Sequence, residues 1–202
     1  CPAYVTKYDM VQDIKDGGTF LLNCEWSPEE VGEHLPGQAK RYMAEHNIKF
    51  YIIDGIKIGK ETGLGKRINT ILQSAFFKLA KIIPEDEAIQ YMKEKAKASY
   101  SKKGDDVVQM NYRGIDAGAN AVVEVPVPAE WKNCKDEDLE AKATEGRKEV
   151  VDFVNTIQKP VNAQKGNELP VSAFAETIDG TFPQGTAAYE KRGVAVDVPV
   201  WD

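Results

Sequence analysis

The chain has 202 residues, 42% hydrophobic and 29% charged, as in an ordinary globular protein with one well-packed core or one domain plus an appendage. Its formal net charge of −6 argues against a general nucleic-acid or anionic-membrane binder, because phosphate contacts need a cationic surface. No apolar run approaches the roughly 20 residues needed to cross a bilayer, and no segment resembles a signal peptide.

Helices and strands are predicted to alternate along the first part of the chain. The pattern predicts an amphipathic helix over residues 4–15, a buried strand over residues 19–23 and a second strand over residues 49–54. Between the strands, Ser27 begins a capped helical segment, and another helical segment follows Gly37. This order predicts a parallel α/β layer.

The carboxyl ends of these strands are candidate ligand positions, because ligands of parallel sheets gather there. Asn23 and Trp26 follow the first strand, and Asp54 closes the second. Trp26 could form a wall of a ligand site, although core packing is favoured because tryptophans are mostly buried for their area.

A glycine-rich turn then leads into a strongly patterned helix. Gly63 and Gly65 precede Arg67 and Asn69 in the first helical turn, with Gln73 one turn further on. Glycines allow close backbone approach, and a helix N-terminus offers unpaired N–H groups, so the place suits an anion such as phosphate. Alternatively, Asn69 and Gln73 are boundary polar residues paired with nearby backbone. The helix carries one apolar stripe: Ile68, Ile71, Leu72, Ala75, Phe76, Leu79, Ile82 and Ile83.

Two further helices, over about residues 84–100 and 106–119, precede a strand over residues 121–125. The lysines of the first could form a cationic patch, but a solvated face balanced by acids is favoured. Residues 149–157 read as a helix that Pro160 breaks, and the chain from residue 164 onward has little periodicity.

The three widely spaced cysteines form no Cys-x-x-Cys pair, which argues against an iron–sulfur or zinc site here. Such spacing is typical of reduced thiols in the cytoplasm.

Several stretches together resemble the pyruvate:ferredoxin (flavodoxin) oxidoreductases, large anaerobic enzymes of several domains. The most specific are residues 179–186 (DGTFPQGT), 189–193 (YEKRG) and 196–201. Residues 18–27 and 63–77 support them, and residues 112–118 with 123–128 do so more weakly.

The resemblance implies a place within a larger enzyme, as does a first residue that is not methionine. Residues 1–127 are expected to form a gamma-type domain without its upstream glycine-rich segment, residues 128–163 a helical connector and residues 164–202 the Glu-Lys-Arg (EKR) linker domain. The expected fold class is α/β, with three α/β/α layers around a mostly parallel sheet and an irregular C-terminal extension.

In this family, pyruvate is decarboxylated on thiamine diphosphate, and electrons pass through [4Fe-4S] clusters to ferredoxin or flavodoxin. Thiamine diphosphate, Mg²⁺ and the clusters belong to other domains, so no cofactor, metal or catalytic residue is expected in this chain. The parent enzyme is expected to be a cytoplasmic homodimer.

The acetyl group passes to coenzyme A, which the gamma-type domain helps to bind. The resemblance therefore assigns Gly65, Arg67, Asn69 and Gln73 to coenzyme A. Arg67 would supply a charged fork for phosphate, Asn69 a directed amide, and Gln73 would orient the pantetheine arm.

Two other functions remain open. The chain could be a purely structural module that spaces the other domains of the parent and binds no ligand. It could also be a self-contained enzyme, although the sequence shows no nucleophile–base pair or metal-ligand cluster. For residues 189–193, a linker held by ion pairs is favoured over a catalytic role.

Overall fold

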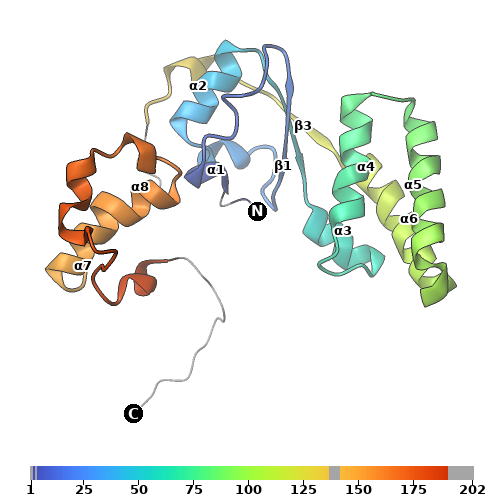
Figure 1. Cartoon of the computed structure of the whole chain (residues 1–202). Helices are drawn as coiled ribbons and strands as arrows, with labels where there is room; N and C mark the ends of the chain where they lie inside the picture. The colour runs from blue at the N-terminus through green and yellow to red at the C-terminus, as the bar shows by residue number, and fades with distance from the viewer. Residues whose placement is uncertain (1, 3, 137–141, 191–202) are drawn as a thin grey trace. The chain divides into compact units, whose positions relative to one another are not determined.

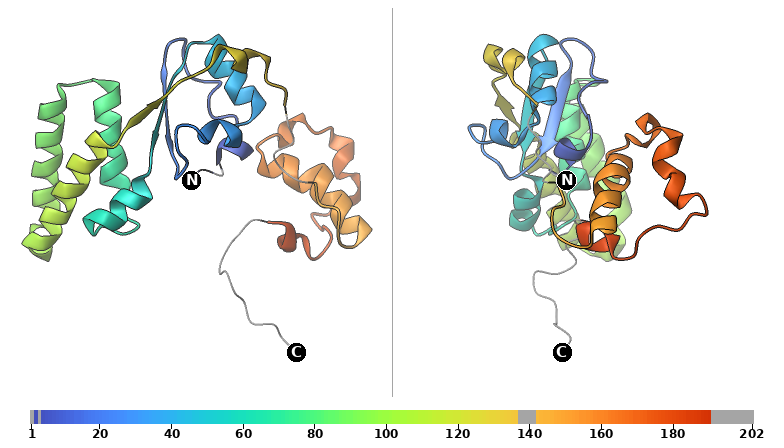
Figure 2. Two further views of the ribbon diagram at one scale, coloured as in Figure 1. Left: turned by 180° about the vertical axis from the view of Figure 1, so that it is seen from behind. Right: turned by 90° about the vertical axis from the view of Figure 1, so that its left-hand side faces the viewer.

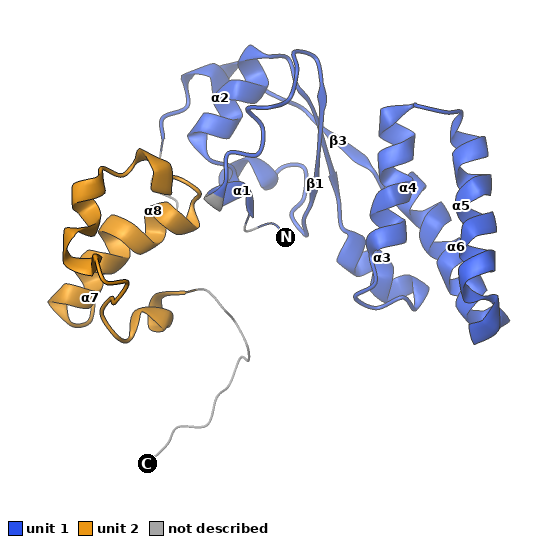
Figure 3. Ribbon diagram, in the orientation of Figure 1, with its two compact units in different colours: residues 1–139 blue, residues 140–202 orange. Residues whose placement is uncertain are grey.

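The computed structural model describes residue 2, residues 4–136 and residues 142–190. The chain divides into two compact units, residues 1–139 and 140–202, coloured separately in Figure 3. The expected domain boundaries after residues 127 and 163 stay a prediction. Each unit is described by itself.

A three-stranded sheet forms the centre of the first unit (Figure 1). Strands β1 (Thr19–Asn23) and β2 (Lys49–Ile53) are parallel, as the sequence predicts. Strand β3 (Val123–Val125) pairs antiparallel to β2, so the sheet is mixed. The α/β class is confirmed, whereas the direction of β3 differs from a parallel arrangement because side-chain alternation carries no information on strand direction.

Side chains of β1 and β2 alternate between two hydrophobic cores, one on each face of the sheet. Phe20, Leu22, Phe50 and Ile52 point to the first core, with Met43 of helix α2 (Gly37–Glu45). The same layer holds α1 (Tyr4–Lys7) and the 3₁₀ helices η1 (Val31–His34) and η3 (Ala129–Asn133).

Helices α3 (Gly55–Thr62), α4 (Asn69–Ala80) and α6 (Asp105–Asn120) cover the other face. Ile53 of β2 meets Ile58, Leu64 and Ile71 there. Helix α5 (Glu85–Tyr100) packs outside them, and the turn η2 (Ser101–Lys103) joins it to α6. Figures 1 and 2 show α2 and α4 on opposite sides of the strands, which gives three layers.

Some local predictions differ from the structure. The first helix ends at Lys7 rather than near residue 15, although Val11 is still buried. Ser27 and Glu30 form the expected reciprocal cap, each backbone N–H donating to the other's side chain at 3.2 and 3.3 Å, but the segment that follows is a 3₁₀ helix. Helix α3 was not predicted.

The second unit is built of short helical pieces around a small core. A π-helical turn η4 (Val154–Gln158) joins α7 (Lys148–Phe153) to α8 (Lys159–Asn162), so the prediction that Pro160 breaks the helix is wrong. The π-helical turn changes the hydrogen-bond pattern just ahead of the proline, which lacks an N–H to donate. Three 3₁₀ turns follow: η5 (Gly166–Glu168), η6 (Val171–Thr177) and η7 (Thr186–Tyr189).

Hydrogen bonds between segments distant in sequence join the pieces of this unit. The Tyr189 hydroxyl donates to the Glu145 carbonyl at 2.5 Å, and the Asn155 side chain exchanges two hydrogen bonds with the backbone of Ala143. The remainder of the Tyr-Glu-Lys-Arg-Gly motif after Glu190, and residues 196–201, lie outside the described residues.

Candidate functional site

The turn between α3 and α4 is shaped by two glycines with positive φ. Gly63 has φ +84° and ends α3, and Gly65 has φ +62°. L-residues rarely adopt this left-handed region, whereas glycine does so at little cost. Nothing lies within 4 Å of the position that a Cβ at Gly65 would occupy, so the backbone there faces open space.

Leu64 anchors this exposed turn to the body of the unit. Its side chain is buried in the second core and lies so close to Gly114 of α6 that a Cβ at Gly114 would collide with it. The Gly65 N–H donates to the Gly59 carbonyl at 2.8 Å, which ties the turn back to α3. The turn is therefore both fixed and accessible.

Helix α4 begins at Asn69 with an open N-terminus. Ile68 occupies the N-cap position and offers no side-chain acceptor to the first backbone N–H groups. Arg67 and Asn69 are both exposed beside them. The sequence left open that the Asn69 and Gln73 side chains pair with nearby backbone. Within the described parts of the chain, neither side chain makes a hydrogen bond to the backbone. The arrangement leaves N–H groups, a guanidinium and an amide available to an anionic ligand.

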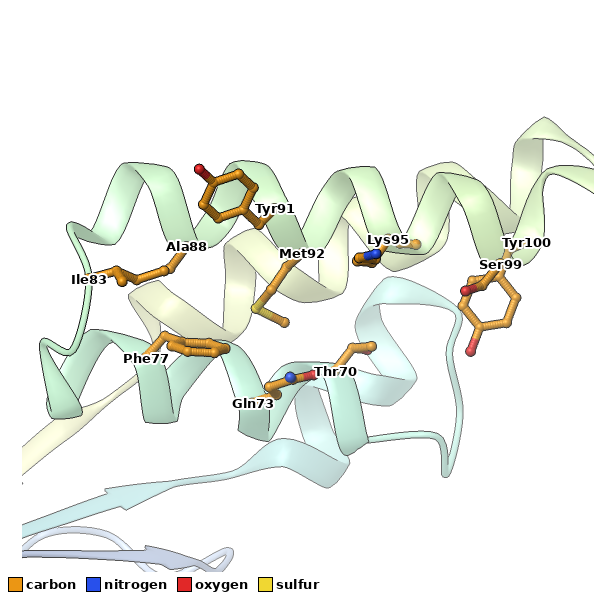
Figure 4. Close-up of a pocket in the computed structure, with 11 residues that line it drawn as sticks. Thr70, Gln73, Phe77, Ile83, Ala88, Tyr91, Met92, Lys95, Ser99 and Tyr100 are labelled. Carbon is orange, nitrogen blue, oxygen red and sulfur yellow. The ribbon is translucent and has the colours of Figure 1, made fainter.

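Gln73, one turn after Asn69 on α4, lines a groove between α4 and α5 (Figure 4). The groove has a volume of about 330 Å³. Its polar end contains Thr70, Lys95 and Ser99 besides Gln73, and the Thr70 Oγ1 atom is buried there with no hydrogen-bond partner among the described residues. Sequence reasoning missed these three residues because helix periodicity gives the faces of α4 and α5 but not which faces meet.

The carboxyl ends of β1 and β2 form a second hollow, of about 440 Å³, as the parallel order predicts. Asn23 Oδ1 accepts the Gly55 N–H at 2.8 Å, and Asp54 Oδ1 accepts the Lys57 N–H at 2.9 Å, so both polar groups are used to begin α3. Cys24 lines the hollow, and burial raises the pKa of its thiol. Trp26 packs beside the first core and stacks on His34, which fits the packing role.

The expectation that this chain holds no metal or cluster of its own stays a prediction. A [4Fe-4S] cluster takes four thiolates, and the sequence holds three cysteines. Among residues 2, 4–136 and 142–190, no three His, Cys, Asp or Glu side chains gather as metal ligands would. None of the helices in these ranges is long and apolar enough to cross a membrane.

The fold and the turn define an α/β protein that presents an open helix N-terminus beside a fixed glycine turn. Comparison with known families gives a more specific assignment. The family described as pyruvate ferredoxin/flavodoxin oxidoreductase matches residues 2–121, and the chain belongs to this family. A second family, EKR, described as a domain of unknown function, matches residues 140–195.

Similar proteins match the chain along almost its whole length. The pyruvate:ferredoxin oxidoreductase of Moorella thermoacetica is 48% identical over 99% of this chain, and the pyruvate-flavodoxin oxidoreductase of Klebsiella pneumoniae is 47% identical over 98%. The pyruvate dehydrogenase [NADP(+)] of Cryptosporidium parvum is 43% identical over 100%. The matched stretch spans only 16%, 17% and 11% of these relatives, respectively.

Proposed function

We propose that this chain acts as one segment of a pyruvate:ferredoxin or flavodoxin oxidoreductase, which converts pyruvate to acetyl-CoA and CO2 and passes electrons to ferredoxin or flavodoxin. Family membership and relatives named for pyruvate support the proposal. Thiamine diphosphate, Mg²⁺ and the iron–sulfur clusters would be held by other parts of a cytoplasmic homodimer. The segment would contribute coenzyme A binding and contacts to other domains.

The turn before α4 is the part of the segment that suits coenzyme A. The observation that carries this is the exposure of Arg67 and Asn69 beside a helix N-terminus whose N-cap residue supplies no side-chain acceptor. Phosphate is stabilised by unpaired N–H groups and by the positive end of the helix dipole. The Arg67 guanidinium would add a charge-assisted fork, and the open backbone at Gly65 would allow close approach.

Gln73 would meet a different part of the same ligand. It lies one turn after Asn69 on α4, at the polar end of the groove. Its amide can donate and accept hydrogen bonds, as the amides of a pantetheine arm require. In this arrangement Gly65, Arg67 and Asn69 bind the phosphates, and Gln73 orients the arm.

The Michaelis constant for coenzyme A in the full-length enzyme tests this assignment. We expect Arg67→Ala or Asn69→Ala to raise it about 10- to 100-fold, because a hydrogen bond to a charged group is worth about 1.5–3 kcal/mol and about 1.4 kcal/mol is a factor of ten. Asn120→Ala is the matched control, since Asn120 is an exposed amide of α6 that bonds only within its own helix, to Asp116 O at 3.0 Å.

The purely structural alternative makes the opposite prediction. If the segment only spaces other domains, both substitutions leave the Michaelis constant for coenzyme A at the value of the Asn120→Ala control. A self-contained enzyme would instead show turnover in the 202-residue chain alone, without the remainder of the parent.

A further inference from the structure

Three exposed apolar side chains lie on α4, on α5 and in the turn between them. Phe76 is 50% exposed, Ile82 67% and Tyr91 54%. The sequence pattern places Phe76 and Ile82 on the buried stripe of α4, and the structure corrects this. Helix α4 ends at Ala80, and Lys81 turns the chain with φ +49°, so Ile82 leaves the helical register.

The apolar end of the α4–α5 groove is continuous with these residues. Phe77, Ile83 and Tyr91 line it, and in Figure 4 Met92 points from α5 toward α4 beside Phe77. Phe76 meets the Phe77 ring edge to face, with centroids 5.5 Å apart. The hairpin surface is defined here as Phe76, Phe77, Ile82, Ile83 and Tyr91.

The hairpin surface is a cluster of exposed and half-buried apolar side chains beside a groove. Single exposed apolar residues are common, but a cluster beside a groove marks a contact site. Aromatic residues in such clusters provide most of the contact energy in protein interfaces. Helices α4 and α5 hold the cluster on a rigid frame, since they pack on each other and on α6.

We propose that the hairpin surface is the docking site for another part of the full-length polypeptide, which inserts apolar side chains between Phe77 and Tyr91. The inference rests on the proposed function, in which the chain is one segment of a larger enzyme. The matched stretch is only 16% of the Moorella relative, so most of that polypeptide lies outside this segment and is available to cover the surface.

The charge of the groove restricts what can dock. Lys95 is the charged residue among those that line it, and it takes part in no ion pair within the described residues. The docking segment therefore places an acceptor, a carboxylate or a main-chain carbonyl, near Lys95 and its apolar side chains toward Ile83.

Site-specific photocrosslinking in the full-length enzyme tests the proposal. We would replace Tyr91 with p-benzoylphenylalanine, irradiate, and map the crosslinked peptides by mass spectrometry. A second variant carries the probe at Ile82, and the control carries it at Glu94, an exposed residue of α5 that does not line the α4–α5 groove. We expect Tyr91 and Ile82 to crosslink to one common segment outside residues 1–202 of the same polypeptide, and Glu94 not to reach it.

Three results would overturn the proposal. A product of doubled mass would show that a second copy of the enzyme covers the surface. Crosslinks confined to residues 1–202, or none, would show that it faces solvent. Coenzyme A that blocks the Tyr91 crosslink would show that the ligand itself fills the apolar end. The Michaelis constant for coenzyme A, measured on the same variants before irradiation, reports separately on the proposed function.

Discussion

Positive φ angles at Gly63 and Gly65 determine how the chain turns from α3 into α4. Leu64 is buried between them, whereas Gly63 and Gly65 are both exposed, so the backbone of the turn stays accessible. The sequence was sufficient to predict that a glycine turn opens a helix here. It was not sufficient to predict that Gln73 lines a groove with residues of α5, because that depends on how α5 packs on α4.

Gly65→Ala tests the backbone requirement of the turn. We expect the free energy of unfolding of the chain to fall by about 1–2 kcal/mol, the cost of holding an L-residue in the left-handed region. Urea titration measures the loss. Gly65→Asn is the control, since asparagine tolerates positive φ and should lose less. Equal losses for both variants would mean that φ is not the cause.

The thiol of Cys24 gives a pH-dependent prediction. Burial is the main cause that raises its folded-state pKa, so the thiolate forms at higher pH than in the unfolded chain. The stability linked to the neutral thiol is then complete below the unfolded-state pKa and is lost as the pH rises through the folded-state value. We expect iodoacetamide to modify Cys24 more slowly than the half-buried Cys134, as measured by peptide mass mapping. Equal rates at pH 8 would contradict the burial of Cys24.

Helices α4 and α6 pack closely on each other in the first unit. A Cβ at Gly118 would collide with the backbone carbonyl of Ile71, and the fully buried Ser74 donates its hydroxyl to the Ile115 carbonyl at 2.5 Å. Small residues on one helix allow the other to approach at backbone distance. The start of α4, with Arg67 and Asn69, is held in place by this contact.

Gly118→Ala should therefore destabilise the first unit. The new methyl group meets backbone that cannot move aside, and overpacking of this kind costs about 1–3 kcal/mol. The matched control is Gly114→Ala on the same helix, where the obstacle is the Leu64 Cδ1 methyl group, which can rotate away. Thermal unfolding of both variants measures the difference. A Tm for Gly118→Ala as high as that for Gly114→Ala would contradict the close approach of the two helices.

The elements that could be predicted from sequence are those with long, unambiguous periodicity. Helices α4, α5 and α6, and strands β1 and β2, lie within a few residues of their expected positions. Helix α3 was missed because it has only 8 residues and its Ile56 and Ile58 alternate as in a strand. The π-helical turn before Pro160 was also not predicted, since the local sequence indicates a break there.

At the scale of the whole molecule, each unit matches a family of its own. Residues 2–121 of the first unit match one family, and residues 140–195 of the second unit match the other. Relatives named for ferredoxin, for flavodoxin and for NADP(+) all match at least 98% of the chain. Under the proposed function, the segment would serve a step that these relatives share rather than the choice of electron acceptor.

A test of this distinction uses the same coenzyme A variant with two substrates. In the full-length enzyme we expect Asn69→Ala to raise the Michaelis constant for coenzyme A and to leave that for ferredoxin or flavodoxin unchanged. Steady-state kinetics with each substrate varied in turn gives both values. A rise in the acceptor constant as large as that for coenzyme A would place the residue in acceptor binding.

Because β3 runs antiparallel to β2, the chain leaves the sheet at the end opposite the carboxyl ends of β1 and β2. Val125 lies beside Phe50, near the amino ends of β1 and β2. From there the chain continues onto α2, where Arg41 donates two hydrogen bonds to the Asp136 carboxylate, of 2.7 and 2.8 Å. Asn23 and Asp54 lie at the opposite end. We therefore expect substitutions at exposed positions of residues 126–136 to leave the hollow beyond the strands unchanged.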